Sequence, residues 1–282
     1  MKRFTAVFCA ALAMCSAASL EAATFFTDKF NYANGDLTLF DGSGDNVSAG
    51  AWTIHSPTGP TFNPPSIDVA NGQAVLLTPG SEDANRAISD PVNDAQGAGE
   101  TWYYAALVTV NDQRATPGTT GIINEYFMHF KDTASNFRSR LYVKDPSTGV
   151  GGAGFRFSMG ASSGAANAVD WGTDLAFGVQ YLVVGSYAFD TGAASLWVNP
   201  ANSASTSITA TASPGPGTFT SALALRQAFI NGAGPNTQIL VNAVAMGDTF
   251  DSVVASVTIP EPATLSLGAL GLLSLVGLGR RR

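Results

Sequence analysis

The chain has 282 residues, with 14 lysines and arginines against 21 aspartates and glutamates. The formal net charge of −7 excludes a protein that binds nucleic acid through a general positive surface, which the phosphate backbone requires. Both cysteines, Cys9 and Cys15, lie close to the N-terminus. The rest of the chain therefore has no thiol for disulfides, catalysis or metal binding.

The N-terminus has the three parts of a secretory signal peptide. Met1-Lys2-Arg3 is basic, residues 4–18 are apolar, and the small residues of SAASLEAA (16–23) follow. We expect cleavage between Ala18 and Ala23, which makes residues 1–23 a signal peptide and the protein an exported one. The segment LAMC (12–15) leaves a lipoprotein alternative open at Cys15, although Met14 is large for the position before a lipidated cysteine.

The C-terminal segment IPEPATLSLGALGLLSLVGLGRRR (259–282) predicts a membrane helix. Residues 263–279 carry no charge, and as a helix they would span roughly 25 Å, within the range of membrane helices. Seven leucines are distributed around the whole helix, whereas a helix packed on a core shows a stripe. The positive-inside rule places Arg280, Arg281 and Arg282 on the cytoplasmic side as a membrane stop. The alternative is a buried C-terminal helix, which would have no use for three terminal arginines.

Pro260, Glu261 and Pro262, followed by the apolar segment and the basic end, resemble the PEP-CTERM sorting signal of Gram-negative bacteria. The resemblance covers residues 259–282 and implies recognition by exosortase, a membrane-embedded transpeptidase-like cysteine protease that removes the tail near the motif. It further implies an inner-membrane intermediate, then the cell surface or extracellular matrix, and an association with exopolysaccharide and biofilm. The tail is a sorting address and carries no enzymatic role.

The intervening residues 24–258 predict one β-rich domain. IDVANGQAVLL (67–77) places Asn71-Gly72 between two alternating runs, a strong hairpin signal. Turn residues separate further stretches rich in β-branched and aromatic residues, at 101–110, 121–130, 137–145, 154–160, 181–200, 224–232 and 238–247. No long segment has a helical period. The low-complexity stretch 201–217 is predicted to be a surface loop, with a linker between two domains as the alternative.

Ten or so short strands predict an all-β fold, an antiparallel jelly-roll sandwich. DKFNYANGDL (28–37), the region of Trp52, and the stretches 181–200 and 239–253 resemble concanavalin A-like, laminin G-type domains. That family includes lectins, adhesion modules and glycosidases, so the resemblance implies a fold and carries no functional motif.

The sequence does not predict an enzyme. Sandwich glycosidases cluster carboxylates on one strand, and no Glu-x-Asp-x-x-Glu run occurs here. Glu125 and His129 would share a strand face, where they form either an acid–base pair or an ordinary polar pair. Asp248 and Asp251 would lie on opposite faces of a strand.

No cofactor is predicted. DGSGDN (41–46) begins like a calcium loop, but Asn46 stands where glycine is expected and Trp52 where glutamate is expected. A polar turn is favoured, while a calcium site assembled from separate loops stays open. Carbohydrate binding usually uses an aromatic platform, and for Trp197 we favour packing in the core. The other candidate platforms are Trp52, Trp102 and Trp171.

The basic residues concentrate in one segment. After both ends are removed, nine basic and twenty acidic residues remain, a net charge of −11, and five of the nine cations lie between Lys131 and Arg156. Arg138, Arg140 and Tyr142 would alternate onto one face, with Arg156 on the next strand. This face is either a solvated surface balanced by acidic residues or a patch for an anionic ligand, since arginine forms forked hydrogen bonds with carboxylates.

These observations predict an exported, non-catalytic protein of the cell surface or biofilm matrix. The expected partners are the exosortase-type protease, the membrane before processing, and an exopolysaccharide or other surface glycan; nucleic acid is not expected. The alternatives are a glycan-active enzyme of the concanavalin A-like superfamily and an ice-binding protein. Flat, regularly repeated threonine faces would support ice binding, and the sequence shows no such repeat.

Overall fold

The computed structural model describes residues 23–39, 46–56, 66–78, 80–88, 99–115, 121–122, 124–133, 136–162, 167–212, 220–227 and 236–258. Outside them lie residues 1–22 of the proposed signal peptide, the first residues of the candidate calcium loop, the motif Pro260-Glu261-Pro262, the predicted membrane helix 263–279 and the arginines 280–282. Within the described part of the chain, no helix is long and apolar enough to cross a membrane.

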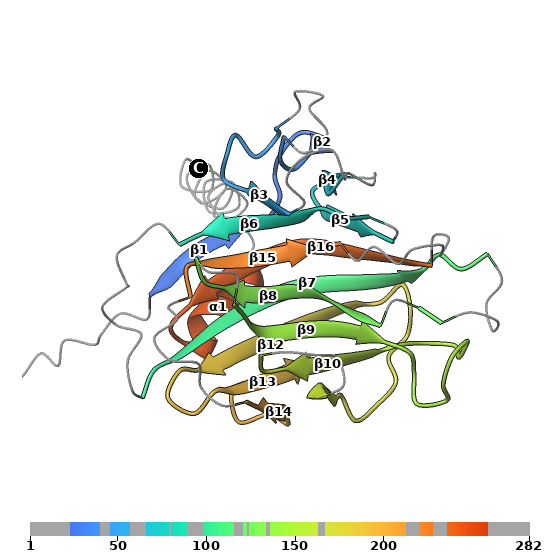
Figure 1. The fold of residues 1–282 in the computed structure, drawn as a ribbon, viewed down its shortest axis with the longest axis vertical. Helices are drawn as coiled ribbons and strands as arrows, with labels where there is room; N and C mark the ends of the chain where they lie inside the picture. The colour runs from blue at the N-terminus through green and yellow to red at the C-terminus, as the bar shows by residue number, and fades with distance from the viewer. Residues whose placement is uncertain are drawn as a thin grey trace, which may run out of the picture.

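Sixteen strands of the described residues form two antiparallel sheets, which confirms the predicted sandwich class (Figure 1). The first sheet, called sheet A, has the order β14 (Ile208–Thr211), β13 (Ala193–Val198), β12 (Gln180–Ala188), β7 (Thr101–Asp112), β16 (Thr237–Gly247), β5 (Ala74–Leu77), β4 (Asp68–Val69) and β2 (Gly35–Asp36), and β1 (Thr24–Asp28) also pairs with β16. The second, called sheet B, has the order β11 (Val169–Asp170), β10 (Arg156–Gly160), β9 (Phe137–Lys144), β8 (Glu125–Lys131), β15 (Ala222–Arg226), β6 (Asp83–Ala87) and β3 (Thr53–Ser56).

The core lies between the two sheets, where alternate residues of each strand point inward. Its largest fully buried side chains come from both sheets and include Trp102 and Tyr104 of sheet A and Phe127, Phe130 and Phe157 of sheet B. Because the same strands turn their other residues outward, each sheet also has an outer face. The two outer faces are covered differently, and this difference locates the candidate site.

The hairpin predicted at Asn71-Gly72 is confirmed. Asn71 and Gly72 have φ angles of +54° and +73°, which is the backbone of a type I′ turn. The flanking residues Ala70 and Gln73 exchange backbone hydrogen bonds at 2.9 and 3.2 Å. This turn fixes the register of β4 against β5, so that Val69 pairs with Ala74.

The prediction of a surface loop over residues 201–217 was wrong for residues 208–211, which form the edge strand β14. Ile208 and Ala210 alternate with exposed threonines, and Ala210 is buried in the core. The Ser195 and Thr209 hydroxyls lie 2.8 Å apart across the β13–β14 pair. A short alternation within a serine- and threonine-rich stretch was therefore sufficient for an edge strand.

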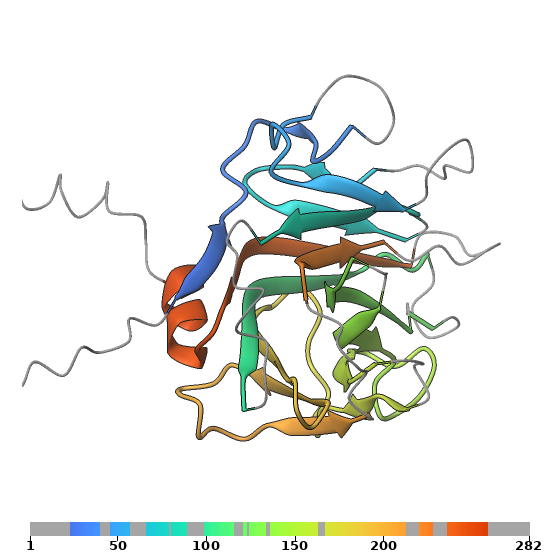
Figure 2. The same cartoon turned by 60° about the vertical axis from the view of Figure 1, so that its left-hand side comes forward.

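The predicted β-rich domain also contains a short helix that the sequence analysis did not predict. Helix α1 (Phe250–Thr258) lies on the outer face of sheet A, opposite sheet B (Figure 2). Phe250, Val253 and Val257 are buried in a second apolar cluster with Trp197, whose ring centroid is 5.3 Å from that of Phe250. Asp251 belongs to the first turn of this helix, so its predicted place on a strand was wrong too.

Candidate functional site

The outer face of sheet B has no helix among the described elements and carries aromatic and charged side chains. On β9, Leu141 and Val143 belong to the core, so Arg140 and Tyr142 point outward. Ring, cation–π and ion-pair contacts join further side chains to these two, and together we call them the sheet B face: His55, Asp83, Tyr126, His129, Phe137, Arg140, Tyr142 and Arg226.

The sheet B face is concave. The ring centroids of His55, on β3, and Phe137, on β9, lie 5.8 Å apart. Strands β6, β15 and β8 separate these two strands in the sheet. At roughly 4.8 Å per neighbouring pair, four steps across a flat sheet would be about 19 Å. The side chains of His55 and Phe137 are too short to account for the difference between the flat-sheet separation and the observed ring distance. The sheet is therefore curved, with its outer face on the concave side.

Arg140 lies among the aromatic rings of this face. Its guanidinium carbon is 4.6 Å from the ring centroid of Tyr126 and 5.2 Å from that of Phe137, within the range of cation–π attraction. Its Nε atom is buried without a hydrogen-bond partner. None of the ion pairs found in the described part of the chain includes Arg140. Its charge is therefore available to a ligand that supplies a carboxylate.

Arg226 is held by two carboxyl groups. Its Nε lies 3.7 Å from Asp83 and its Nη1 lies 3.4 Å from Glu125, while its guanidinium carbon is 4.2 Å from the Tyr126 ring centroid. Burial raises the pKa of Asp83 to about 7, because the lost hydration outweighs the attraction of Arg226. Unlike Arg140, Arg226 therefore already has acidic partners within the protein.

His129 is the most buried polar group of the sheet B face. Its side chain is fully buried and neither ring nitrogen has a hydrogen-bond partner. Burial lowers the pKa of His129 well below its usual range, and the neighbouring Arg140 and Arg226 lower it further. The imidazole is therefore neutral at physiological pH. It makes no hydrogen bond to Glu125, so the structure does not form the acid–base pair considered from the sequence.

The predicted patch of Arg138, Arg140 and Arg156 is not one cluster. Ser139 has a φ of +47°, and its hydroxyl donates to the Ser186 carbonyl of sheet A at 2.9 Å. This bulge interrupts the alternation of β9, so Arg138 lies beside Tyr187 of the core. Burial raises the pKa of the Tyr187 phenol, and the charge of Arg138 opposes that rise. Sequence periodicity assumed an unbroken strand.

Arg156 shares the outer face with Arg140 but is separated from it along the strands. Arg140 pairs with Gly160, and Arg156 pairs with Lys144, which places the two arginines four residues, or about 13 Å, apart. Arg156 binds Asp174 at 2.6 Å, and Lys144 binds Asp170 at 3.0 Å. This end of the face is therefore balanced by acidic residues, as the solvated-surface alternative proposed.

Three of the four candidate tryptophans do not form the platform that carbohydrate binding would use, whereas Trp171, directly after β11, is partly exposed. Trp52 and Trp102 are buried in the core, and Trp197 is buried beneath α1, which agrees with the core packing favoured for Trp197. The partly exposed rings of the candidate site are instead Tyr126 and Phe137, which the sequence analysis did not single out as a platform. The only sequence signal for these two rings was the high aromatic content of β8 and β9.

No group of three or more histidine, cysteine or acidic side chains that could hold a metal ion occurs within the described ranges.

The comparisons with known proteins give distant similarities. No family model matches the chain, and no curated protein matches it. Among solved structures it is similar to a sialidase (14% identity, 88% of this chain, TM-score 0.44), to the alginate lyase Aly36B (13%, 77% of this chain and 94% of that chain, TM-score 0.45) and to the CBM2 module of Lactobacillus casei BL23 phage J-1 evolved Dit (14%, 80% and 96%, TM-score 0.43). The chain spans 21% of the length of the sialidase. Similarities this distant carry neither a function nor a substrate to this chain.

Proposed function

We propose that this protein is an exported, non-catalytic protein of the cell surface or extracellular matrix, sorted by its PEP-CTERM tail, that binds an acidic polysaccharide on the sheet B face. The observation that carries the proposal is the position of Arg140. Its guanidinium lies between aromatic rings on a concave face and has no carboxylate partner among the described residues.

A polyuronate matches this chemistry better than a neutral glycan. A partly buried arginine gains most from a carboxylate, which accepts two parallel hydrogen bonds from the guanidinium fork. The partly exposed rings of Tyr126 and Phe137, whose centroids are 6.2 Å apart, offer surface for the C–H face of a sugar. The strongly acidic remainder of the chain is compatible with such a ligand only where a local positive charge outweighs it, and Arg140 supplies that charge.

The binding experiment compares two arginines of the same face. Isothermal titration calorimetry with alginate and polygalacturonate, and with dextran as the neutral glycan, would be run on the wild type, Arg140→Gln and Arg156→Gln. We expect binding of a polyuronate that weakens as salt rises and falls about 10- to 100-fold in Arg140→Gln, since a hydrogen bond to a charged group contributes about 1.5–3 kcal/mol. Arg156→Gln should bind nearly as the wild type does, because Asp174 already balances Arg156.

Equal affinities of the wild type and Arg140→Gln for each polyuronate would overturn the assignment of the site. Binding of dextran with the same affinity would overturn the choice of an acidic ligand.

One observation favours a second candidate function, a glycan-cleaving enzyme. Asp83 and Glu125 both contact Arg226, and the raised pKa of Asp83, about 7, lets this carboxyl group hold a proton near neutral pH. Glycoside hydrolysis uses a protonated carboxyl group and a second carboxylate. The calorimetry samples should be assayed for new reducing ends. Products that disappear in Asp83→Asn would favour the enzyme over the binding protein.

A further inference from the structure

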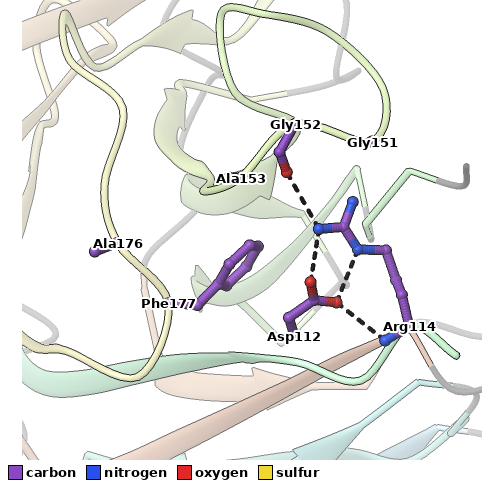
Figure 3. Close-up of a pocket in the computed structure, with 7 residues that line it drawn as sticks. All are labelled: Asp112, Arg114, Gly151, Gly152, Ala153, Ala176 and Phe177. Atoms are coloured by element: carbon purple, nitrogen blue, oxygen red, sulfur yellow. Dashed lines mark hydrogen bonds and ion pairs between the residues drawn. The ribbon is translucent and has the colours of Figure 1, made fainter. Parts of the chain in front are cut away.

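A pocket lies at the C-terminal end of β7, at one end of the sandwich (Figure 3). It has a volume of about 430 Å³ and is lined by Asp112 and Arg114 at and after the end of β7, by residues 151–153 and by Ala176 and Phe177. These residues come from three separate segments. The size is within the range of small-molecule sites, roughly 300–1,000 Å³, and none of these residues belongs to the sheet B face.

The polar side of the pocket is a fixed carboxylate. Arg114 donates from Nε to Oδ1 and from Nη2 to Oδ2 of Asp112, both at 2.7 Å, and its backbone N–H donates to Oδ1 at 3.0 Å. Arg114 also donates to the Gly152 carbonyl at 3.2 Å. The Arg114 side chain is 1% exposed and that of Asp112 is 20% exposed. The buried Arg114 therefore fixes the orientation of the more exposed Asp112 carboxylate.

This arrangement leaves the carboxylate able to accept one more hydrogen bond. A carboxylate has about four acceptor positions, and Arg114 occupies three of those on Asp112. Since the two charges neutralise each other, the pocket does not select for an ion. It presents a rigid acceptor to an uncharged donor.

The opposite side of the pocket is apolar. The Phe177 ring faces the pocket between Ala153 and Ala176 (Figure 3), and the Arg114 guanidinium carbon is 5.6 Å from its centroid. The pocket therefore has an aromatic wall in addition to its fixed carboxylate.

We propose that this pocket is a second ligand site, distinct from the sheet B face, that binds one uncharged sugar residue. A sugar ring has hydroxyl groups that donate to the fixed Asp112 carboxylate and a C–H face that packs against an aromatic ring such as Phe177. An anionic sugar would be repelled by the Asp112 carboxylate, because Arg114 is already paired with that carboxylate and cannot bind the sugar's charge as well. The two sites would thus differ in ligand charge, and neither proposal rests on the other.

The probes are uncharged monosaccharides: glucose, galactose, mannose, fucose and N-acetylglucosamine. Each would be titrated into the purified protein while the backbone amide signals are followed by two-dimensional ¹H–¹⁵N NMR. We expect at least one sugar to cause saturable shifts in residues 151–153 and 176–178. Phe177→Leu removes the ring and Ala153→Leu fills the pocket, and each should weaken binding about tenfold.

Ala204→Leu is the matched control, because it makes the same change as Ala153→Leu at an exposed turn position that does not line the pocket. It should bind as the wild type does. If Phe177→Leu does not fold, Ala153→Leu gives the decisive comparison by itself. The proposal is overturned if no sugar of this set shifts those amides, or if the shifts persist unchanged in Ala153→Leu. Failure here would leave the polyuronate experiment unaffected, since that experiment uses charged ligands and another face.

Discussion

The carboxylate of Asp28 accepts hydrogen bonds from four residues in three segments of the chain. Oδ1 accepts from the backbone N–H of Phe30 at 2.8 Å, and Oδ2 accepts from the Tyr32 hydroxyl at 2.7 Å and from Trp52 Nε1 at 2.8 Å. Arg86 on β6 completes the set with an ion pair to Oδ2. This network joins β1 of sheet A to β6 of sheet B and holds Phe30 in a left-handed conformation, with a φ of +50°.

Asp28→Ala should therefore destabilise the fold strongly. The substitution leaves the charge of Arg86 without its partner and the buried indole N–H of Trp52 unsatisfied, and breaking a buried ion pair in this way costs about 3–5 kcal/mol. Urea unfolding followed by tryptophan fluorescence measures the change. Asp190→Ala, at an exposed position of the β12–β13 turn, is the control and should lie within about 0.5 kcal/mol of the wild type. A loss below about 1 kcal/mol for Asp28→Ala would contradict the network's role.

Glu82 is a second buried carboxyl group, and its burial makes the stability of the fold depend on pH. It accepts from the Thr38 hydroxyl at 2.6 Å and from the Ile67 N–H at 2.5 Å. Burial nevertheless raises its pKa from 4.5 to about 7, and the nearby Asp36 and Asp68 contribute to the rise. The folded state therefore binds this proton more tightly than the unfolded state does. The stability contribution is fully present below pH 4.5 and is lost as the pH rises through 7.

The difference between Glu82→Gln and the wild type isolates this effect, since His129, with a lowered pKa, has the opposite pH dependence. From about pH 5 to about pH 8 the unfolding free energy of the wild type should fall relative to that of the variant by about 2–3 kcal/mol, at about 1.4 kcal/mol per pKa unit. Urea unfolding at several pH values measures both curves. Parallel curves across this range would show that Glu82 ionises as easily in the folded protein as in the unfolded one.

At the scale of elements, the sequence predicted the strands whose signals are local. The Asn71-Gly72 turn and the aromatic alternation of β7, β9 and β12 are visible within short windows, so their strands were predicted with nearly correct bounds. Helix α1 had a weaker signal. Thr249 caps its first turn, with Oγ1 accepting from the Ser252 N–H at 3.3 Å, and its buried residues recur at helical spacing. So short a helix is not distinguished from a strand by its periodicity.

The candidate site depends on information that no single strand contains. Arg140 and Tyr142 were assigned to one face correctly, but the bulge at Ser139 turned Arg138 away from that face and toward Tyr187. The sharing of Arg226 by Asp83 and Glu125 joins three strands, β15, β6 and β8. The curvature that brings β3 toward β9 is likewise a property of the whole of sheet B. These contacts depend on pairing between strands that are distant in the sequence, so the spacing of residues within one strand does not predict them.

At the scale of the whole molecule, the two sheets have different outer surfaces. Sheet A is covered by α1, whose apolar side packs on Trp197 and Ala105, whereas the sheet B face has no helix on it among the described elements. The last described residue, Thr258, ends α1 directly before the segment 259–282. The end of the folded body is anchored by Val257, which is buried, and the proposed sorting motif begins two residues after Thr258.

This junction leads to a prediction about sorting. Pro260 and Pro262 lack the backbone N–H that a helix requires, so we expect α1 to stop before the motif and leave an accessible segment for the protease. In a Gram-negative host with exosortase, the wild type should lose the residues after the motif, while Glu261→Ala should keep them and stay in the membrane fraction. Intact-mass spectrometry of the two proteins measures this difference, with Glu100→Ala as the control that should be processed normally. Because Phe250 and Val257 pack against residues that precede the tail, such as Trp197, we expect the processed and unprocessed forms to unfold at the same urea concentration. Identical C-terminal masses for the wild type and Glu261→Ala would contradict the sorting role of the motif, and a lower midpoint for the processed form would show that the tail supports the fold.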